Sequence, residues 1–201
     1  MDNLIRVYDN VIDSEYCFEL MDKFENNEQL HQKFDDRGMI FTQINIQKVG
    51  WIHDVNLLKA VFTDHVEKYK NDCKVKEQQM PLTCVLEPIR MKRYLPNNYD
   101  EFKPHVDVNQ KANCTRFLVM FLYLADNKKG KTIFPNLDIE IECKQGSLLM
   151  FPPMWPWLHA GTKPIDKPKY IIGSYLHYDD SFTKYVYHED PKTESEWKSD
   201  Y

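Results

Sequence analysis

Residues 102–107 read FKPHVD, a segment that places a histidine and an aspartate two positions apart. In an extended strand, residues i and i+2 point to the same side, so His105 and Asp107 can reach one metal ion without backbone distortion. In a helix, two steps would separate the same side chains by about 200°. The pair therefore predicts a β-strand at this point of the chain.

A second histidine further along the chain, His159, completes a set of two imidazoles and one carboxylate. Non-haem Fe(II) oxygenases use this set to hold one face of an octahedral ion, which leaves the opposite face open. An H-x-D tripeptide alone is weak evidence, because it occurs by chance in many proteins. Taken singly, each of the three residues is better explained by a structural or surface role. The surrounding sequence favours the metal site.

From Leu86 onward, short β-like segments alternate with turn signals at residues 95–98 (LPNN), 126–130 (DNKKG) and 152–153 (PP). The predicted strands are residues 86–95, 104–109, 115–125, 131–134, 138–143, 147–151, 156–160 and 168–178. Strands at this spacing indicate a sandwich or barrel, here a double-stranded β-helix, also called a jelly roll.

The region before Leu86 predicts helices and strands that support this core. Residues 4–8 read as a short strand, and Asp13 or Ser14 caps a helix that extends to about Glu25. Residues 39–49 alternate as a strand does, and a second helix starts after Asp54. We expect both helices to pack on the outside of one sheet. The predicted fold is mainly β with flanking helices (α+β).

The chain is expected to fold as one unit in three parts. Residues 1–85 form an N-terminal support region integral to the fold, residues 86–178 form the double-stranded β-helix core, and residues 179–201 form a C-terminal tail. The polar tail is either a loose arm or packs on the core through Phe182, Tyr185 and Tyr187. We find no internal repeat and no low-complexity linker.

The composition of the 201 residues limits the classes of partner. A net charge of −5 gives no general attraction to phosphate backbones or anionic membranes, which disfavours nucleic acid and membranes. The five cysteines contain no C-x-x-C pair, which predicts reduced thiols. The longest apolar run, residues 117–125, is shorter than the roughly 20 residues of a spanning helix, and the N-terminus shows no secretory signal. We predict a cytoplasmic protein, and the oligomeric state stays open.

Further residues follow the order and spacing of a known family. They are KRYLP at 92–96, Arg116, YL at 123–124, GKTIFP at 130–135, GSLLMF at 146–151, HAG at 159–161 and KY at 169–170. Over residues 86–178 the chain resembles the 2-oxoglutarate- and Fe(II)-dependent oxygenases, in the branch that resembles prolyl 4-hydroxylases.

This resemblance implies a catalytic core with His105, Asp107 and His159 as the catalytic iron ligands. It also implies that Lys169 holds the far carboxylate of 2-oxoglutarate and that Tyr94 and Tyr123 hydrogen-bond this co-substrate. Lys169 makes independent physical sense, because an unpaired ammonium at the start of the apolar strand 170–173 would be costly without an anionic ligand. The alternatives are a solvated strand-end lysine and tyrosines that merely pack in the core.

The resemblance implies an enzyme, a 2-oxoglutarate-dependent dioxygenase that uses Fe(II), 2-oxoglutarate and O₂, with ascorbate as an accessory reductant. It would hydroxylate an unactivated C–H bond and release succinate and CO₂. The leading substrate is a prolyl residue in a peptide or protein. The alternatives are a free amino acid or another small molecule, and a non-catalytic jelly roll that holds a metal. A nucleic-acid demethylase is disfavoured, because that pattern has two arginines after the distal histidine.

Some residues near the motif stay open in role. Residues 154–157 (MWPW) either wall the substrate mouth or pack in the core, and the lysine-rich turn 128–131 is expected to be solvated. Lys129, Ala125 and Tyr175 stand where the family often has a glycine, an asparagine and a tryptophan. These differences bear on the shape of the substrate site.

Overall fold

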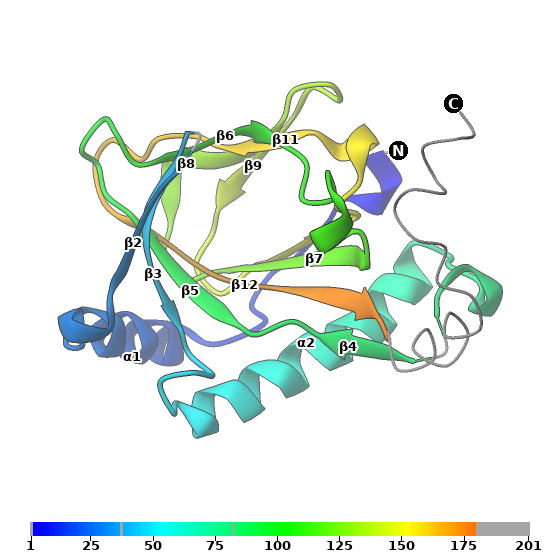
Figure 1. Cartoon of the computed structure of the whole chain (residues 1–201), viewed down its shortest axis with the longest axis horizontal. Coiled ribbons are helices and arrows are strands. Elements are labelled where there is room, and N and C mark those ends of the chain that lie inside the picture. Colours follow the sequence, from blue (N-terminus) through cyan, green and yellow to red (C-terminus); the bar gives the residue numbers. More distant parts are fainter. Residues whose placement is uncertain (1, 37, 82, 180–201) are drawn as a thin grey trace, which may run out of the picture.

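A curled antiparallel sheet forms the core of the computed structural model, which describes residues 2–36, 38–81 and 83–179 (Figure 1). The strands are β1 Arg6–Tyr8, β2 Gln32–Asp36, β3 Met39–Asn45, β4 Cys84–Leu86, β5 Arg90–Tyr94, β6 Glu101–His105, β7 Arg116–Tyr123, β8 Asn127–Phe134, β9 Ile139–Cys143, β10 Leu148–Phe151, β11 His159–Gly161 and β12 Lys169–Tyr178. The helices are α1 Ser14–Glu25 and α2 Ile52–Asp72, with short 3-10 turns at Asp2–Leu4, Glu28–Leu30, Glu77–Gln79, Lys111–Asn113 and Trp155–Trp157.

The sheet folds over on itself to make two facing layers. Its strand order is β1-β10-β7-β12-β5-β3-β6-β11-β8-β9, with β2 beside β3 and β4 beside β12. Strand β3 joins the layers, because it pairs with β5 in one and, through Met39 opposite Phe102, with β6 in the other. Figure 1 shows β6, β8, β9 and β11 facing β5, β7 and β12 across the interior. This is the jelly roll that the strand spacing predicted.

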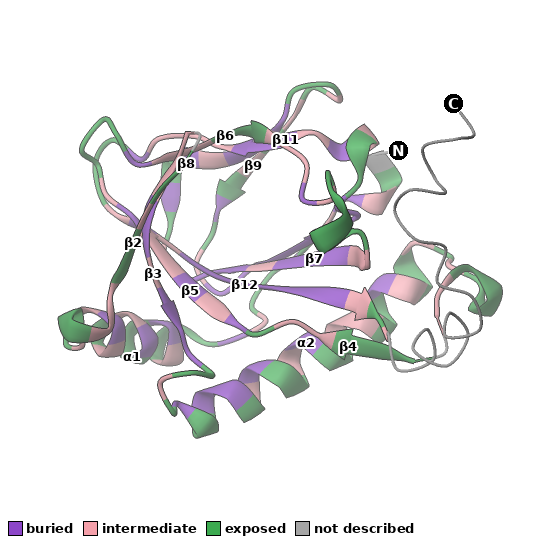
Figure 2. Cartoon of the chain, in the orientation of Figure 1, coloured by how far each residue is buried: buried purple, intermediate pink, exposed green. Residues whose placement is uncertain are grey.

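Both helices cover the outer face of the layer that contains β5, β7 and β12. Helix α1 begins where predicted, with the Asp13 side chain accepting a hydrogen bond from the Tyr16 amide at 2.7 Å. The buried residues of both helices share one core with outward-facing residues of the sheet: Cys17, Leu20, Phe24, Val55, Leu58 and Phe62 against Ile44, Met91, Leu122 and Ile172. Figure 2 shows the buried sides of α1 and α2 turned toward the sheet. The predicted position of the helices is confirmed.

The opposite side of the same strands lines the interior of the jelly roll. Along β7, Leu118, Met120 and Leu122 join the helix-facing core, whereas Val119 and Tyr123 join a second core inside. This alternation follows from the two-residue period of a strand. Strand residues one position apart therefore serve two purposes, since one set anchors the helices and the other reaches the interior where a site can form.

We expect Phe62→Ala to destabilise the fold strongly. Phe62 lies on α2 and is fully buried against the sheet, so the variant loses its apolar contacts and leaves a cavity. Substitutions of this kind cost roughly 3–5 kcal/mol of unfolding free energy. Urea denaturation measures the change, and Lys59→Ala, on an exposed position of the same helix, is the control. Equal stabilities of the two variants would contradict the packing of α2 described above.

Several elements in the N-terminal half differ from the sequence prediction. Strands β1 and β3 are shorter than the predicted strands 4–8 and 39–49. Strand β2 was not predicted, because its sequence QKFDD is polar and only Phe34 is half-buried; the strand exists by pairing with β3. Helix α2 begins at Ile52, before Asp54, and its N-cap residue Trp51 supplies no side-chain hydrogen bond. Trp51 is instead held by burial in the core, which local sequence signals do not reveal.

Several boundaries differ within the jelly roll. The predicted strand 86–95 is divided into β4 and β5, and the predicted strand 156–160 begins only at His159, because residues 155–157 form a 3-10 turn with a proline near its start. Strand β6 ends at His105, so Asp107 lies just beyond the strand rather than inside it. Strand β8 begins at Asn127, where a solvated turn was predicted, because the buried Asn127 pairs with Cys143 and accepts hydrogen bonds from Lys129 and Gly130 amides. Lys128 and Lys129 remain exposed, as the prediction required.

The predicted C-terminal tail lies outside the described residues from 180 onward. Within the described part of the chain, neither helix combines the length and apolarity that crossing a membrane requires.

Candidate metal centre and co-substrate pocket

The structure brings His105, Asp107 and His159 to one point at the interior edge of the β6–β11 pair. His105 is the last residue of β6 and His159 the first of β11, and the two are directly paired across the antiparallel ladder. Asp107 continues past the strand and is fixed there because its amide donates a hydrogen bond to the Pro153 carbonyl at 3.1 Å. Asp107 therefore reaches the histidines from a turn, although the prediction placed it in a strand.

Potential ligand atoms of these three residues all lie within 4.8 Å of one another. His105 Nε2 is 3.7 Å from Asp107 Oδ1, and His159 Nε2 is 3.3 Å from Asp107 Oδ2. The distances exceed those of ordinary hydrogen bonds, and the atoms face a common centre. This spacing suits donors that share a metal ion.

Backbone hydrogen bonds fix the orientation of both imidazoles. The Nδ1 atom of His105 lies 2.7 Å from the Lys103 carbonyl oxygen, and Nδ1 of His159 lies 3.0 Å from the Trp157 carbonyl oxygen. A carbonyl oxygen only accepts, so each Nδ1 carries the proton and each Nε2 presents a lone pair. Such a hydrogen bond to the far nitrogen is the usual way in which metal-binding histidines are oriented.

Three polar atoms of the cluster form no hydrogen bond in the described structure. His105 Nε2, His159 Nε2 and Asp107 Oδ2 are buried and have no hydrogen-bond partner there. Buried polar atoms are nearly always hydrogen-bonded, so three unsatisfied acceptors that converge require an explanation. A divalent cation would satisfy all three at once, and the donor set fits Fe(II).

The electrostatics keep the cluster in the protonation state that a cation needs. Burial lowers the pKa of His159 to about 4, so this imidazole is neutral at neutral pH. Burial alone would raise the pKa of Asp107, but His159, His105 and a hydrogen bond from Tyr175 outweigh it and hold this pKa well below its usual range. Asp107 is thus a carboxylate and His159 a free base, as metal ligation requires.

Tyr175 is a supporting residue whose role the sequence did not reveal. Its hydroxyl donates a hydrogen bond to Asp107 Oδ1 at 2.8 Å, and the Arg116 guanidinium lies 4.0 Å from the centroid of its ring. Arg116 is itself held by Glu87 at 2.7 Å. A usable signal was present, because Tyr175 has the same strand parity as Lys169 and so faces the same interior.

We expect Tyr175→Phe to weaken metal binding by about 10- to 100-fold without loss of the fold, the range found when a residue that orients a ligand is removed. The ring stays in place, so only the hydrogen bond to Asp107 is lost. Titration with Mn(II), followed by calorimetry, measures the affinity. Tyr178→Phe, on the half-exposed end of the same strand, is the matched control. An unchanged affinity in Tyr175→Phe would show that the hydrogen bond does not position the carboxylate.

A pocket opens beside the metal cluster and shares His159 with it. It is lined by Lys92, Tyr94, Phe102, Phe121, Thr132, His159, Gly161, Lys169, Ile171 and Gly173. Most of this lining is apolar or aromatic, with few polar groups, which is typical of sites for small molecules. The pocket can therefore hold a ligand that also reaches the metal position.

Lys169 provides a buried cation in this pocket. It is only 2% exposed, and its Nζ lies 5.7 Å and 5.8 Å from the ring centroids of Tyr94 and Tyr123. Its one direct hydrogen bond to an oxygen atom in the described structure is a long one of 3.4 Å to the Lys131 carbonyl. Burial lowers its pKa, against a smaller opposing effect of Cys143. Such a cation favours an anionic ligand, and its burial excludes the alternative of a solvated strand-end lysine.

Glycine provides the room for the Lys169 side chain. A Cβ atom at Gly130 would come within 3.1 Å of Lys169 Cδ, tighter than ordinary van der Waals contact, and one at Gly161 would lie 3.7 Å from Lys169 Nζ. Gly130 belongs to the GKTIFP segment noted in the sequence. A side chain at that position would press on the lysine.

The two tyrosines predicted to contact the co-substrate flank Lys169 on different strands. Tyr94 is directly paired with Lys169 across β5 and β12, and its hydroxyl forms no hydrogen bond within the described structure. The Tyr123 hydroxyl bonds Thr132 Oγ1 at 2.7 Å. Both rings are buried. Tyr94 can therefore donate to a ligand at once, whereas Tyr123 is already engaged with Thr132.

Two other features near the site divide in role or lie away from the metal cluster. Trp157 is buried in the interior core, whereas Trp155 is 79% exposed, so the MWPW segment both packs and presents an aromatic surface. His177 is bonded to Thr115 at 2.9 Å and lies near Glu87, outside the metal cluster.

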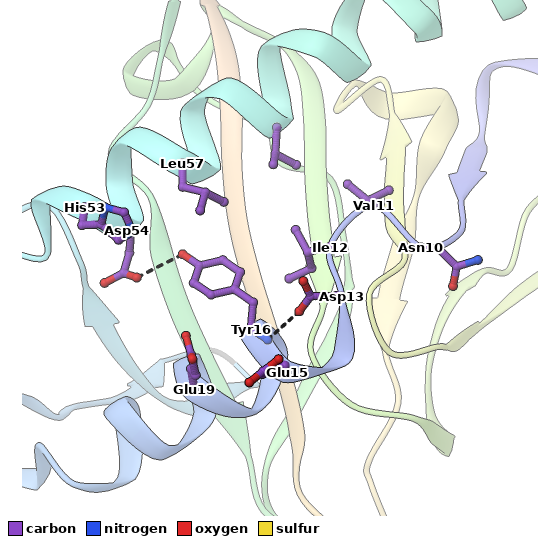
Figure 3. A pocket seen from close by; sticks show the side chains of 11 residues that line it. Asn10, Val11, Ile12, Asp13, Glu15, Tyr16, Glu19, His53, Asp54 and Leu57 are labelled. Carbon is purple, nitrogen blue, oxygen red and sulfur yellow. Dashed lines mark hydrogen bonds between the residues drawn. The ribbon is translucent and has the colours of Figure 1, made fainter.

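Another cavity lies between α1 and α2, on the opposite side of the sheet from the metal cluster (Figure 3). Its lining is rich in carboxylates, including Glu15, Glu19 and Asp54. The buried Asp54 is already satisfied, because Tyr16 donates to it at 3.0 Å and Lys23 pairs with it. The cavity therefore lacks the unsatisfied donors and acceptors found at the metal cluster.

A jelly roll that converges two imidazoles and one carboxylate beside an interior pocket has the arrangement of a mononuclear non-haem Fe(II) oxygenase. Comparison with known families makes this specific. The model of the 2OG-Fe(II) oxygenase superfamily matches residues 89–177, the part of the chain that runs from β5 to β12 and contains the metal cluster. This match and the His-Asp-His cluster together support a 2-oxoglutarate-dependent dioxygenase with Fe(II) as cofactor and 2-oxoglutarate as co-substrate.

The proteins to which this chain is similar include several that are named prolyl hydroxylases. A protein of Acanthamoeba polyphaga mimivirus named "Putative prolyl 4-hydroxylase" is 28% identical over 187 residues, which cover 82% of this chain and 70% of that protein. The viral collagen prolyl hydroxylase of Paramecium Bursaria Chlorella virus-1, solved with 2-oxoglutarate, matches with a TM-score of 0.61 at 16% identity, over 88% of this chain and 96% of that one. A Trichoplax adhaerens prolyl hydroxylase matches with a TM-score of 0.68 at 15% identity, over 93% and 88%. At these identities the two structures support the shared fold.

Proposed function

We propose that this protein hydroxylates a prolyl residue in a peptide or protein and releases succinate and CO₂. The observation that carries the proposal is the convergence of three unsatisfied buried ligand atoms beside a pocket that holds a buried ammonium. The named relatives support the substrate class. The Trichoplax protein was solved with a peptide fragment of hypoxia inducible factor, and the mimivirus protein is named as a prolyl 4-hydroxylase.

Each residue of the site has a defined task in this proposal. His105, Asp107 and His159 would hold Fe(II), with each Nδ1–H donating to a backbone carbonyl so that Nε2 stays available. Once bound, the ion would combine O₂ with the oxidative decarboxylation of 2-oxoglutarate, so that one oxygen atom enters succinate and the other is available for C–H hydroxylation. Tyr175 keeps the carboxylate of Asp107 turned toward the histidines.

The pocket residues bind and orient the co-substrate. Lys169 would pair with the far carboxylate of 2-oxoglutarate, and the free hydroxyl of Tyr94 would donate a hydrogen bond to it. The Tyr123 hydroxyl donates to Thr132, which lines the pocket, so Tyr123 would contribute to co-substrate binding by holding Thr132 in place. Ile171 and Phe121 line the pocket with apolar surface, which would limit the access of water to the metal position.

Anaerobically purified protein, supplied with Fe(II), 2-oxoglutarate, ascorbate and then O₂, tests the proposal on a panel of proline-containing peptides. We expect one or more peptides to gain the mass of one oxygen atom, with succinate formed in equal amount. Matched peptides with alanine in place of proline are the control. Oxygen gained only by free proline or by an unrelated metabolite would contradict the substrate class. Metal binding without any succinate would instead favour a non-catalytic jelly roll.

A further inference from the structure

Lys92 is a second lysine in the co-substrate pocket, and the proposed roles above leave it without a task. It lies on β5, two residues before Tyr94, and is paired with Ile171 of β12. Tyr94 and Ile171 both line the pocket, and so does Lys92. The alternation of strand residues thus directs Lys92 and Tyr94 into the same interior.

The ammonium of Lys92 has aromatic neighbours and no carboxylate partner. Its Nζ lies 4.7 Å from the ring centroid of Phe41 and 5.4 Å from that of Phe102. In the described part of the chain it makes no hydrogen bond and no salt bridge. Lys92 is half-buried, and cation–π contacts compensate part of the cost of partly desolvating its charge, but they leave its hydrogen-bonding capacity unused.

The two lysines occupy different ends of the pocket. Lys169 Nζ lies near the Lys131 carbonyl and Gly161. Lys92 lies toward the metal cluster, because the Phe102 ring beneath its ammonium is itself 3.8 Å from the His105 ring. Among charged groups, Asp107 acts most strongly on Lys92. A ligand that extends from Lys169 to the metal position would pass Lys92 at its metal-side end.

We propose that Lys92 binds the carboxylate of 2-oxoglutarate that belongs to its keto acid end, so that two lysines hold the two ends of one dianion. The charges favour this occupant. The positive charges of two ammonium groups and a divalent ion would exceed the negative charge of the Asp107 carboxylate. A dianionic ligand would neutralise most of this excess positive charge. An ammonium also gains charge-assisted hydrogen bonds that the aromatic rings cannot supply.

The proposal rests on the proposed function, and binding measurements separate the two. The probes are 2-oxoglutarate and 2-oxobutyrate, which keeps the keto acid end but lacks the far carboxylate. Dissociation constants are measured by calorimetry on the Mn(II)-loaded wild type, Lys92→Met and Lys169→Met. Lys59→Met, on an exposed position of α2, is the control and should match the wild type. Methionine retains most of the side-chain volume, so we expect all four proteins to fold, which melting curves verify.

We expect Lys92→Met to weaken the binding of 2-oxoglutarate and of 2-oxobutyrate by the same factor. The factor should be about tenfold or more, because the variant loses a hydrogen bond to a charged group. Lys169→Met should weaken the binding of 2-oxoglutarate but not that of 2-oxobutyrate, which lacks the far carboxylate. The assignment of Lys92 falls if its variant binds both ligands as the wild type does, or if only 2-oxoglutarate is weakened. A wild-type protein that binds neither ligand would overturn the proposed function as well as this inference.

Discussion

Asp107→Ala is expected to abolish Fe(II)-dependent turnover of 2-oxoglutarate. Asp107 is the one carboxylate in the metal cluster of the described structure, and its two oxygens face the Nε2 atoms of His105 and His159 at 3.7 Å and 3.3 Å. Without it, only the two imidazoles remain, and they neither complete the ligand set nor offset the charge of the ion. Removing a residue that only orients a metal ligand lowers metal affinity or activity by about 10- to 100-fold. Removing the ligand itself should lower them further.

Succinate release and Mn(II) affinity measure this prediction together. Asp107→Asn is the more conservative variant, because its amide oxygen can still accept the hydrogen bond from Tyr175. It should also be inactive, since the ligand charge is gone. Asp166→Ala removes an exposed carboxylate and serves as the control. Full turnover in a correctly folded Asp107→Ala protein would contradict the metal site.

Lys169→Met is expected to weaken 2-oxoglutarate binding by roughly 30-fold or more. The prediction follows from burial, because a buried charge pair that loses one partner costs about 2–5 kcal/mol, or roughly 30- to several-thousand-fold in affinity. Lys169 is almost fully enclosed and would be the partner of the far carboxylate. Calorimetry on the Mn(II)-loaded protein measures the loss. Lys167→Met, an exposed lysine in the preceding loop, is the control.

The same substitution should have the opposite effect on the stability of the ligand-free protein. An ammonium without an anionic partner in an apolar interior destabilises the native state, so an apolar residue of similar length should leave stability equal or raise it. Addition of 2-oxoglutarate should then raise the melting temperature of the wild type and not that of Lys169→Met. A variant that is less stable and still binds 2-oxoglutarate normally would assign Lys169 a structural role instead.

The pH dependence of this stability difference has a defined sign. Burial lowers the pKa of Lys169 below its ordinary value of 10.5, so the unfolded chain binds this proton more tightly than the native protein does. Stability rises with pH wherever the unfolded state holds more protons. The ligand-free wild type should therefore gain stability relative to Lys169→Met as the pH rises toward 10.5, and denaturation at several pH values measures this.

Sequence patterns were sufficient for the architecture because the relevant signals are local. The period of two along segments such as residues 168–178, and the helical period with the Asp13 cap, depend only on neighbouring residues. The structure accordingly has β12 at Lys169–Tyr178 and α1 at Ser14–Glu25. Where a strand depends on its partner rather than its own sequence, as with the polar β2, local signals fail.

The candidate ligands could be named in advance because the chemistry restricts the residue types. The H-x-D pair suits a metal ion, and the resemblance to the 2-oxoglutarate- and Fe(II)-dependent oxygenases then singled out His105, Asp107, His159 and Lys169 together. Their convergence depends on the pairing of β6 with β11, which joins segments distant in sequence. Orientation was beyond prediction, because the tautomers are fixed by the carbonyls of Lys103 and Trp157.

Residue types and their periodicity thus specified the jelly roll, its covering helices and the chemical class of the site. Folding contributed the relations across strands. It placed Tyr175 against Asp107 and put Lys92 in one pocket with Lys169. Those relations depend on the register between strands and on which side chains remain without partners once the chain is packed, and both are properties of the assembled sheet rather than of any segment of it.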